Sequence, residues 1–255
     1  MSTARLGDRS LFPDLHWSVY GNHAAVSPLS APAQAAVAHA SARLAREGLG
    51  ALTQDLELRD GLRADLARLL QVDSSTVGLI ANTSAGISHI ALSIPWKPGE
   101  RILTFQGEFP ANITPWMCAA NAFDLTVERL SLEGVTHGGF LDDLRAELSR
   151  GVRLVAVSAV QFQTGLRMPI EAMGQLCHEY GAELFVDGIQ AVGSTPLDLS
   201  HVDYLAAGSH KWMMGCMGTG VLYVAAGAAQ QLIPVSYTHL RAPRDQRGSR
   251  MPSSA

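Results

Sequence analysis

Lysine is almost absent from this sequence, and charged residues as a whole are scarce. The 255 residues include 19 lysines and arginines, of which only Lys97 and Lys211 are lysine, and charged residues make up 16% of the chain. An average soluble domain has roughly 25%, so we expect much of this chain to be buried in a core or a subunit interface. The formal net charge of -4 gives no general attraction to nucleic acid or to anionic membranes.

Long apolar runs and paired cysteines are also missing. No run approaches the roughly 18 to 20 residues of a membrane-spanning helix, and residues 1–17 carry charges and a proline where a signal peptide needs an apolar stretch. The cysteines, Cys118, Cys177 and Cys216, are widely spaced, which argues against a disulfide framework or a zinc knuckle. The histidines show no metal-ligand spacing. We therefore expect a cytoplasmic protein without a metal site.

Apolar runs and helical patterns alternate along the chain. Strand-like runs without a clean in-and-out alternation are separated by helical segments, which predicts an α/β fold with a mostly parallel central sheet and helices on both faces. Hydrophobic residues make up 47% of the chain, enough to fill a sizeable core. The expected strands are residues 101–105, 125–130, 153–160, 183–187, 204–207 and 220–224. The expected helices are residues 28–47, 53–70, 85–94, 111–122, 141–148 and 169–180.

The composition changes near the C-terminus. Residues 235–255 contain four arginines, one acidic residue and no periodic apolar pattern, which is typical of a disordered tail. The stretch VSYTHLRA within it also resembles adaptor-derived read-through at the ends of some metagenomic reading frames, so we expect the tail to be non-native. The expected organisation is an N-terminal arm over residues 1–19, a large domain over residues 20–234, and this tail.

Two polar side chains lie where a parallel sheet places its ligands. Asp187 ends a predicted strand, and Lys211 follows the next predicted strand 24 residues later. The carboxyl ends of parallel strands meet at one edge of a sheet, so both side chains can point into one crevice. A lysine in a desolvated pocket has a pKa lowered by up to roughly 3 to 5 units, and so supplies the free amine that forms a Schiff base. Lys97 lies in a turn-like segment and is expected at the surface.

Four segments around these residues resemble one family. Residues 202–222, VDYLAAGSHKWMMGCMGTGVL, resemble the pyridoxal-phosphate attachment signature of class V aminotransferases, and residues 186–193, VDGIQAVG, resemble the V-D-x-x-Q segment of that family. Residues 20–25, YGNHAA, and 107–112, GEFPAN, resemble its opening segment and its ring-stacking loop. The resemblance covers residues 12–234, and it implies the pyridoxal-phosphate-binding large domain of a fold type I enzyme, with the small C-terminal domain missing.

The resemblance implies two catalytic residues and a binding site for pyridoxal 5′-phosphate. Lys211 would carry the cofactor as a Schiff base and move a proton during catalysis. Asp187 would keep the ring nitrogen of the cofactor protonated. Thr83 and Ser84, with the backbone amide of Ala85, would bind the phosphate at the start of a helix, where free N–H groups and the helix dipole attract anions.

The resemblance also places residues around the cofactor ring and on the far side of the phosphate. Phe109 would stack on the ring where family members often have a histidine, and phenylalanine cannot transfer a proton. Gln190 would hydrogen-bond the 3′-oxygen of the ring. Ser209 and His210 would approach the phosphate from the other side, although many relatives carry the serine one position earlier. Of the two glutamines in residues 161–163, either is a candidate to point into the crevice.

Several reactions remain open, because enzymes of this family share their first step on an amino acid. We predict an aminotransferase that acts on an amino acid through a Schiff base at Lys211. The alternatives are a cysteine desulfurase or selenocysteine lyase, an amino-acid epimerase, and an inactive truncated fragment that only binds the cofactor. The resemblance implies a homodimer in the full-length protein. It also places the arginine that grips the substrate carboxylate, and the desulfurase nucleophile, in the missing C-terminal part.

Overall fold

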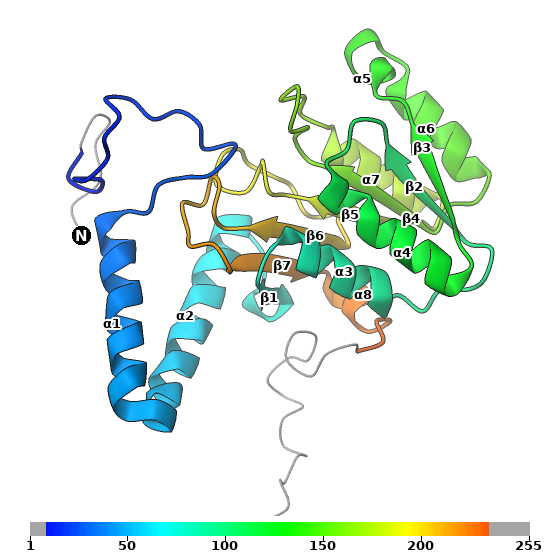
Figure 1. Ribbon diagram of the computed structural model, residues 1–255. Helices are drawn as coiled ribbons and strands as arrows, with labels where there is room; N and C mark the ends of the chain where they lie inside the picture. Colours follow the sequence, from blue (N-terminus) through cyan, green and yellow to red (C-terminus); the bar gives the residue numbers. More distant parts are fainter. Residues whose placement is uncertain (1–8, 235–255) are drawn as a thin grey trace, which may run out of the picture.

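The computed structural model describes residues 9–234 (Figure 1). The predicted tail, residues 235–255, and residues 1–8 of the predicted N-terminal arm lie outside the described residues. The helices are α1 (Ala31–Glu47), α2 (Leu52–Leu70), α3 (Thr83–Ser93), α4 (Thr114–Phe123), α5 (Glu133–His137), α6 (Phe140–Ser149), α7 (Ile170–Glu179) and α8 (Ala226–Ala229). The strands are β1 (Val77–Ile80), β2 (Arg101–Phe105), β3 (Thr126–Leu130), β4 (Leu154–Ser158), β5 (Glu183–Asp187), β6 (Tyr204–Gly208) and β7 (Gly220–Val224).

The described strands form one mixed sheet in the order β1-β7-β6-β5-β4-β2-β3. Strand β7 runs antiparallel to both of its neighbours, β1 and β6, and the other neighbouring pairs are parallel. Six of these strands therefore point the same way, and their carboxyl ends lie at one edge. The predicted α/β fold with a mostly parallel sheet is confirmed.

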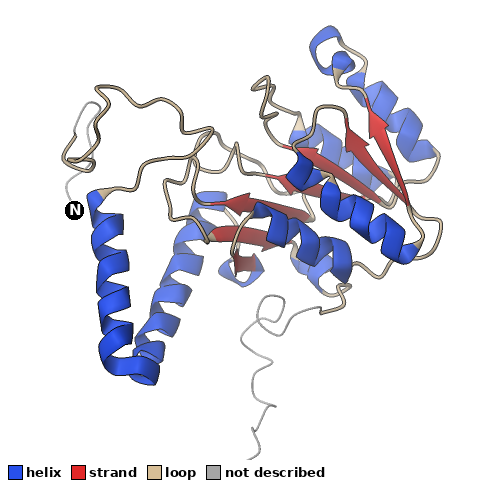
Figure 2. Ribbon diagram, viewed as in Figure 1, coloured by secondary structure: helices blue, strands red, loops and turns tan. Residues whose placement is uncertain are grey.

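Helices cover both faces of the sheet (Figure 2). On one face α6 and α7 pack on alternate strand residues such as Val155 and Leu184, and on the other α3 and α4 pack on the intervening residues, such as Leu154 and Phe185. All four of these strand side chains are fully buried. Burial on both faces explains why the sequence shows continuous apolar strands without alternation.

Element boundaries differ from the predicted ones where caps and prolines act. The first helix begins at Ala31 rather than residue 28 because the Ser30 side chain caps it, accepting a hydrogen bond from the Ala33 N–H. The predicted helix 111–122 splits into a 3₁₀ turn (Pro110–Asn112) and α4. Strand β1 was not predicted, because four residues that include a glycine carry too little periodic signal.

Helices α1 and α2 form a hairpin that projects from the sheet (Figure 1). Arg43, only 4% exposed, joins the two helices through Gln54 and Asp55. The predicted helix 53–70 is confirmed as α2, yet its Leu56 and Leu69 are about half exposed. The apolar face of this hairpin is therefore not buried within residues 9–234.

Helix α3 lies unusually close to the sheet, which fixes the position of its N-terminus. A Cβ atom at Gly86 would lie 2.6 Å from the Ile80 side chain and 2.8 Å from the Ala206 Cβ. Only glycine permits this approach. The start of α3 is thereby held beside the carboxyl end of β6.

Candidate active site

The segments predicted to carry the site meet at the carboxyl edge of the sheet. They are the start of α3 after β1, residues 107–112 after β2, residues 158–163 after β4, residues 187–190 after β5, and residues 208–211 after β6. Ligands in α/β folds bind at this edge, where loops leave the strands. The topology thus brings together residues that are far apart in the sequence.

Asp187 lies at the last position of β5 and is 2% exposed. Its Oδ1 accepts a hydrogen bond from the Ile189 N–H at 3.0 Å. Burial raises the pKa of Asp187 to about 7, and the negative charge of Glu108 acts in the same direction, while the positive charge of Lys211 opposes it. A buried carboxyl group that titrates near neutrality can hold either a proton or a negative charge next to a ligand.

Lys211 follows β6 and has a partly buried side chain. Burial lowers the pKa of its amine, and the opposing effect of Asp187 is smaller. The amine forms no ion pair within residues 9–234, and Nζ lies 5.8 Å from the centroid of the Phe109 ring. The structure therefore provides an unpaired amine with a lowered pKa, beside an aromatic ring.

Phe109 and Phe162 form an aromatic pair at this edge. Their ring centroids are 5.1 Å apart at an interplanar angle of 78°, an edge-to-face arrangement. Phe109 is 44% exposed, so one face of its ring is free to cover a bound group. Of the two glutamines beside Phe162, Gln161 is buried and Gln163 is exposed.

The start of α3 offers a candidate phosphate site. Thr83 Oγ1 accepts a hydrogen bond from the Gly208 N–H at 2.9 Å, which ties the helix to the end of β6. The N–H groups of Thr83 and Ser84 have no acceptor within the described part of the chain. The N–H of Ala85, which the sequence assigned to the phosphate, donates instead to the cap Asn82 Oδ1 at 2.8 Å. This helix start therefore offers an anion the free N–H groups of Thr83 and Ser84. To bind the Ala85 N–H as well, the anion would have to displace the Asn82 side chain.

The two residues before Lys211 are arranged differently from each other. The Ser209 hydroxyl donates to the Cys216 carbonyl at 2.8 Å and contacts Thr219 Oγ1, so it is occupied within its own loop. His210 has a pKa lowered by burial and by the charge of Lys211, which favours the neutral imidazole. A Cβ atom at Gly208 would lie 3.1 Å from His210 Nδ1 and 3.3 Å from Thr83 Oγ1. Gly208 thus lets the imidazole and the Thr83 hydroxyl both lie close to the backbone at the end of β6.

Gln190 connects the site to the N-terminal segment. Its Nε2 donates to the Ala24 carbonyl at 3.0 Å, and its Oε1 accepts from Trp212 Nε1 at 2.7 Å. One hydrogen of Nε2 remains available for the predicted contact with the cofactor ring. The predicted role of Gln190 therefore depends on that single hydrogen.

Sequence reasoning missed two residues that support the site. Ser27, 6% exposed, donates its N–H to the His210 carbonyl at 2.8 Å and its hydroxyl to the Lys211 carbonyl. No local pattern predicts this contact, because 184 residues separate Ser27 from Lys211. Glu108, 8% exposed, accepts four hydrogen bonds next to Phe109. An acidic residue inside the ring-stacking segment was the available signal.

The residues present fit pyridoxal phosphate. The site combines an unpaired amine, a buried carboxyl group that can face a ring nitrogen, an aromatic face and free N–H groups at a helix start. Lys211, Asp187 and Phe109 would hold the ring, and Thr83 and Ser84 would hold the phosphate.

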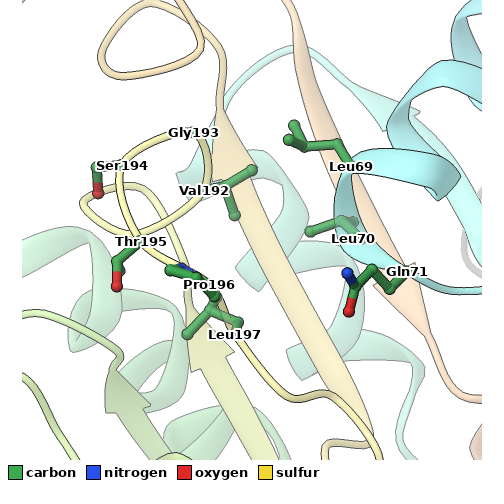
Figure 3. Close-up of a pocket in the computed structure, with 9 residues that line it drawn as sticks. All are labelled: Leu69, Leu70, Gln71, Val192, Gly193, Ser194, Thr195, Pro196 and Leu197. Atoms are coloured by element: carbon green, nitrogen blue, oxygen red, sulfur yellow. The ribbon is translucent and has the colours of Figure 1, made fainter.

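A separate cavity of about 320 Å³ lies between the end of α2 and residues 192–197 (Figure 3). No titratable side chain lines this cavity, so it offers no acid–base chemistry.

Replacing Thr83 with valine tests how the helix start is held. Valine keeps the shape but removes Oγ1, and leaves the buried Gly208 N–H without an acceptor. We expect the free energy of unfolding to fall by about 1 to 3 kcal/mol, measured by urea denaturation, and the affinity for inorganic phosphate to fall with it. Thr164→Val is the matched control, because the Thr164 hydroxyl also accepts a backbone N–H, from Leu166 at 3.2 Å, but at the surface. Equal losses in the two variants would contradict the expectation.

Residues 9–234 contain no group of three or more histidine, cysteine or acidic side chains arranged to hold a metal ion. None of the helices in that range is long and apolar enough to cross a membrane.

Comparison with known proteins gives one consistent result. The family model described as "Aminotransferase class-V" matches residues 29–239. The chain is 30% identical to a cysteine desulfurase of Escherichia coli over 247 residues, which cover 89% of the chain and 59% of that protein. It is 34% identical to a probable cysteine desulfurase of Chlamydia muridarum over 157 residues, which cover 60% of the chain and 38% of that protein. The chain thus spans about 40% to 60% of the length of these relatives.

Solved structures of related folds agree with the sequence comparison. A mutant of C-DES with glycine covalently linked to its PLP cofactor has a TM-score of 0.83 and 28% identity, over 89% of this chain and 62% of that one. C-DES is also described as a cystine C–S lyase, in complex with its product cysteine persulfide. The cysteine desulfurase of Thermococcus onnurineus, at 24% identity and a TM-score of 0.77, shares the fold.

Proposed function

Because the chain belongs to the class V aminotransferase family, whose cofactor is pyridoxal 5′-phosphate, we propose that it is the large domain of an enzyme that cleaves the carbon–sulfur bond of cysteine or cystine. The observation that carries this proposal is the similarity, over 89% of the chain, to the Escherichia coli cysteine desulfurase and to C-DES. The aminotransferase predicted from the sequence has support only at the level of the family. The relatives favour the desulfurase alternative.

Lys211 and Asp187 have the central chemical roles in this proposal. When bound, pyridoxal phosphate supplies an electron sink that stabilises negative charge at the α-carbon of an amino acid. Lys211 would hold the cofactor through Nζ, and its lowered pKa raises the fraction of neutral amine that could attach it or accept a proton. Asp187 titrates near pH 7 without a ligand, and a positive charge brought beside it favours its carboxylate form.

The neighbouring side chains restrict which groups move protons. Phe109 has no titratable group, so it can cover the ring and exclude water but cannot act as an acid or a base. Burial and the charge of Lys211 lower the pKa of His210, which favours its neutral form, and we assign this imidazole to a phosphate oxygen. We therefore assign proton transfer at the α-carbon to Lys211.

The acceptor of the released sulfur is not Cys177 in this proposal. Burial raises the pKa of the Cys177 thiol to about 12, which keeps it protonated and unreactive. A lyase that releases a persulfide, as the cystine lyase C-DES does, needs no cysteine nucleophile.

The exposed leucines of the α1–α2 hairpin support the further proposal that the full-length protein is a homodimer.

The test compares two reactions in the chain loaded with pyridoxal phosphate and in the full-length protein. One assay offers L-cysteine or L-cystine and measures sulfide and persulfide, and the other offers an amino donor with a 2-oxo acid and measures the new amino acid. We expect sulfur release that does not depend on the 2-oxo acid. Amino transfer without sulfur release would favour the aminotransferase. Cofactor binding without either reaction in both proteins would contradict the proposal.

A further inference from the structure

Glu108 is a buried acid that the proposed chemistry does not use directly. It lies after β2, immediately before Phe109, and its two oxygens accept hydrogen bonds from four groups. Oε1 accepts from the Ser158 N–H at 2.7 Å and from Gln161 Nε2 at 2.8 Å. Oε2 accepts from the Ser158 hydroxyl and from Asn112 Nδ2 at 3.0 Å.

These contacts join two segments that both end at the crevice. Ser158 and Gln161 belong to the segment after β4, whereas Asn112 closes the loop that carries Phe109. Phe162, the residue after Gln161, packs edge-on against Phe109. The carboxyl group of Glu108 therefore links the segments on both sides of the aromatic pair, through the Ser158 backbone and the side chains of Gln161 and Asn112.

The surroundings of Glu108 are rich in hydrogen-bond donors. All four contacts are donated to its carboxyl oxygens. Ser158 lies opposite Asp187 in the register of β4 and β5. The charged groups that act on Asp187 are Glu108 from the β2 side and Lys211 from the β6 side, and Glu108 raises the pKa of Asp187.

We propose that Glu108 is a positioning residue, which holds Phe109 and the segment after β4 in place around the crevice and sets a negative charge behind Asp187. The importance of Glu108 for catalysis rests on the proposed function. Its hydrogen bonds to Ser158 and its electrostatic effect on Asp187 are independent of that function, because both are present in the chain without cofactor. Loss of Glu108 would free the aromatic loop and leave four donors without their acceptor.

The first experiment measures Glu108→Gln in the chain without cofactor, with Glu179→Gln, an exposed change at the end of α7, as the control. The side-chain carboxyl signals of ¹³C-labelled aspartates are followed against pH by NMR, and Asp187→Asn identifies the signal of Asp187. We expect Glu108→Gln to move the titration midpoint of Asp187 downward, because a negative charge next to it is removed. We also expect the Ser158 amide to exchange with solvent about tenfold faster or more, since its acceptor is weakened.

A second variant separates charge from position. Ser158→Ala removes one hydrogen bond to Glu108 and keeps the negative charge, so the midpoint of Asp187 should not move downward. In the loaded chain, Glu108→Gln should weaken pyridoxal-phosphate binding about tenfold. The inference is overturned if Glu108→Gln gives the same result as Glu179→Gln in both measurements, the titration midpoint of Asp187 and the exchange rate of the Ser158 amide. If the wild-type chain binds no cofactor, the proposed function fails, and these two measurements still decide the role of Glu108.

Discussion

Replacing Lys211 with alanine should abolish covalent attachment of pyridoxal phosphate to this chain. The reason is that Lys211 provides the partly buried, unpaired amine at the carboxyl edge of the sheet, with a lowered pKa. Reduction of the loaded wild-type chain with borohydride should fix one pyridoxyl group on Lys211, detected by mass spectrometry. The variant should lose this label and the associated absorption band completely, although weak non-covalent binding at the start of α3 is expected to persist.

The composition of the chain makes the control unusually clean. Lys97 is the second of only two lysines and is exposed, so Lys97→Ala should keep the full label and the absorption band. A label found on Lys97, or an undiminished label in Lys211→Ala, would refute the assignment of the site.

Replacing Asp187 with asparagine should stabilise the cofactor-free chain and weaken cofactor binding. The pKa of Asp187 is about 7 in the folded chain and 3.8 ordinarily, so the folded state binds its proton more tightly than the unfolded state. The contribution of Asp187 to stability is therefore lost as the pH rises from about 4 to 7, and stays lost above pH 7. The difference between these pKa values corresponds to about 4 kcal/mol, at about 1.4 kcal/mol per pKa unit.

Asparagine keeps an oxygen for the Ile189 N–H but carries no charge. In urea denaturation at a series of pH values, Asp187→Asn should match the wild type near pH 4 and exceed it by up to about 4 kcal/mol at pH 8. Spectroscopic titration with pyridoxal phosphate should show the opposite sign, with affinity about tenfold weaker or more. Asp14→Asn, at an exposed site, should change stability by less than about 0.5 kcal/mol at any pH. A stability difference that does not grow with pH would contradict the buried-charge explanation.

Most of the fold was predictable because it depends on local patterns. The boundaries of β2, β5 and β7 match the predicted ranges, since continuous apolar runs between turn residues are a strong signal for buried strands. The prediction missed β1, whose identity depends on pairing with β7. The paired residues are far apart in the sequence, from 146 positions for Val77 and Tyr223 to 140 positions for Ile80 and Gly220. A short strand of this kind is stabilised by its partner and carries little signal of its own.

The candidate site was predictable in its residue types but not in its hydrogen bonds. The positions of Lys211 and Asp187 after neighbouring strands predicted that both would face one crevice, and the charge of each shifts the pKa of the other. The sequence could not show that the Ser209 hydroxyl and the Ala85 N–H are already occupied by Cys216 and Asn82. A hydrogen-bond donor has a limited number of hydrogens, and only the folded structure shows where each one goes.

The sequence by itself determined the class of fold and the family, and it singled out the lysine proposed to carry a cofactor, because these depend on residue types and their spacing along the chain. The tertiary structure alone decided which distant groups support that lysine, such as Ser27 behind its carbonyl and Glu108 behind Asp187. It also decided the pKa of Asp187, because the cost of holding a charge depends on burial and on the neighbouring charges that folding brings within reach.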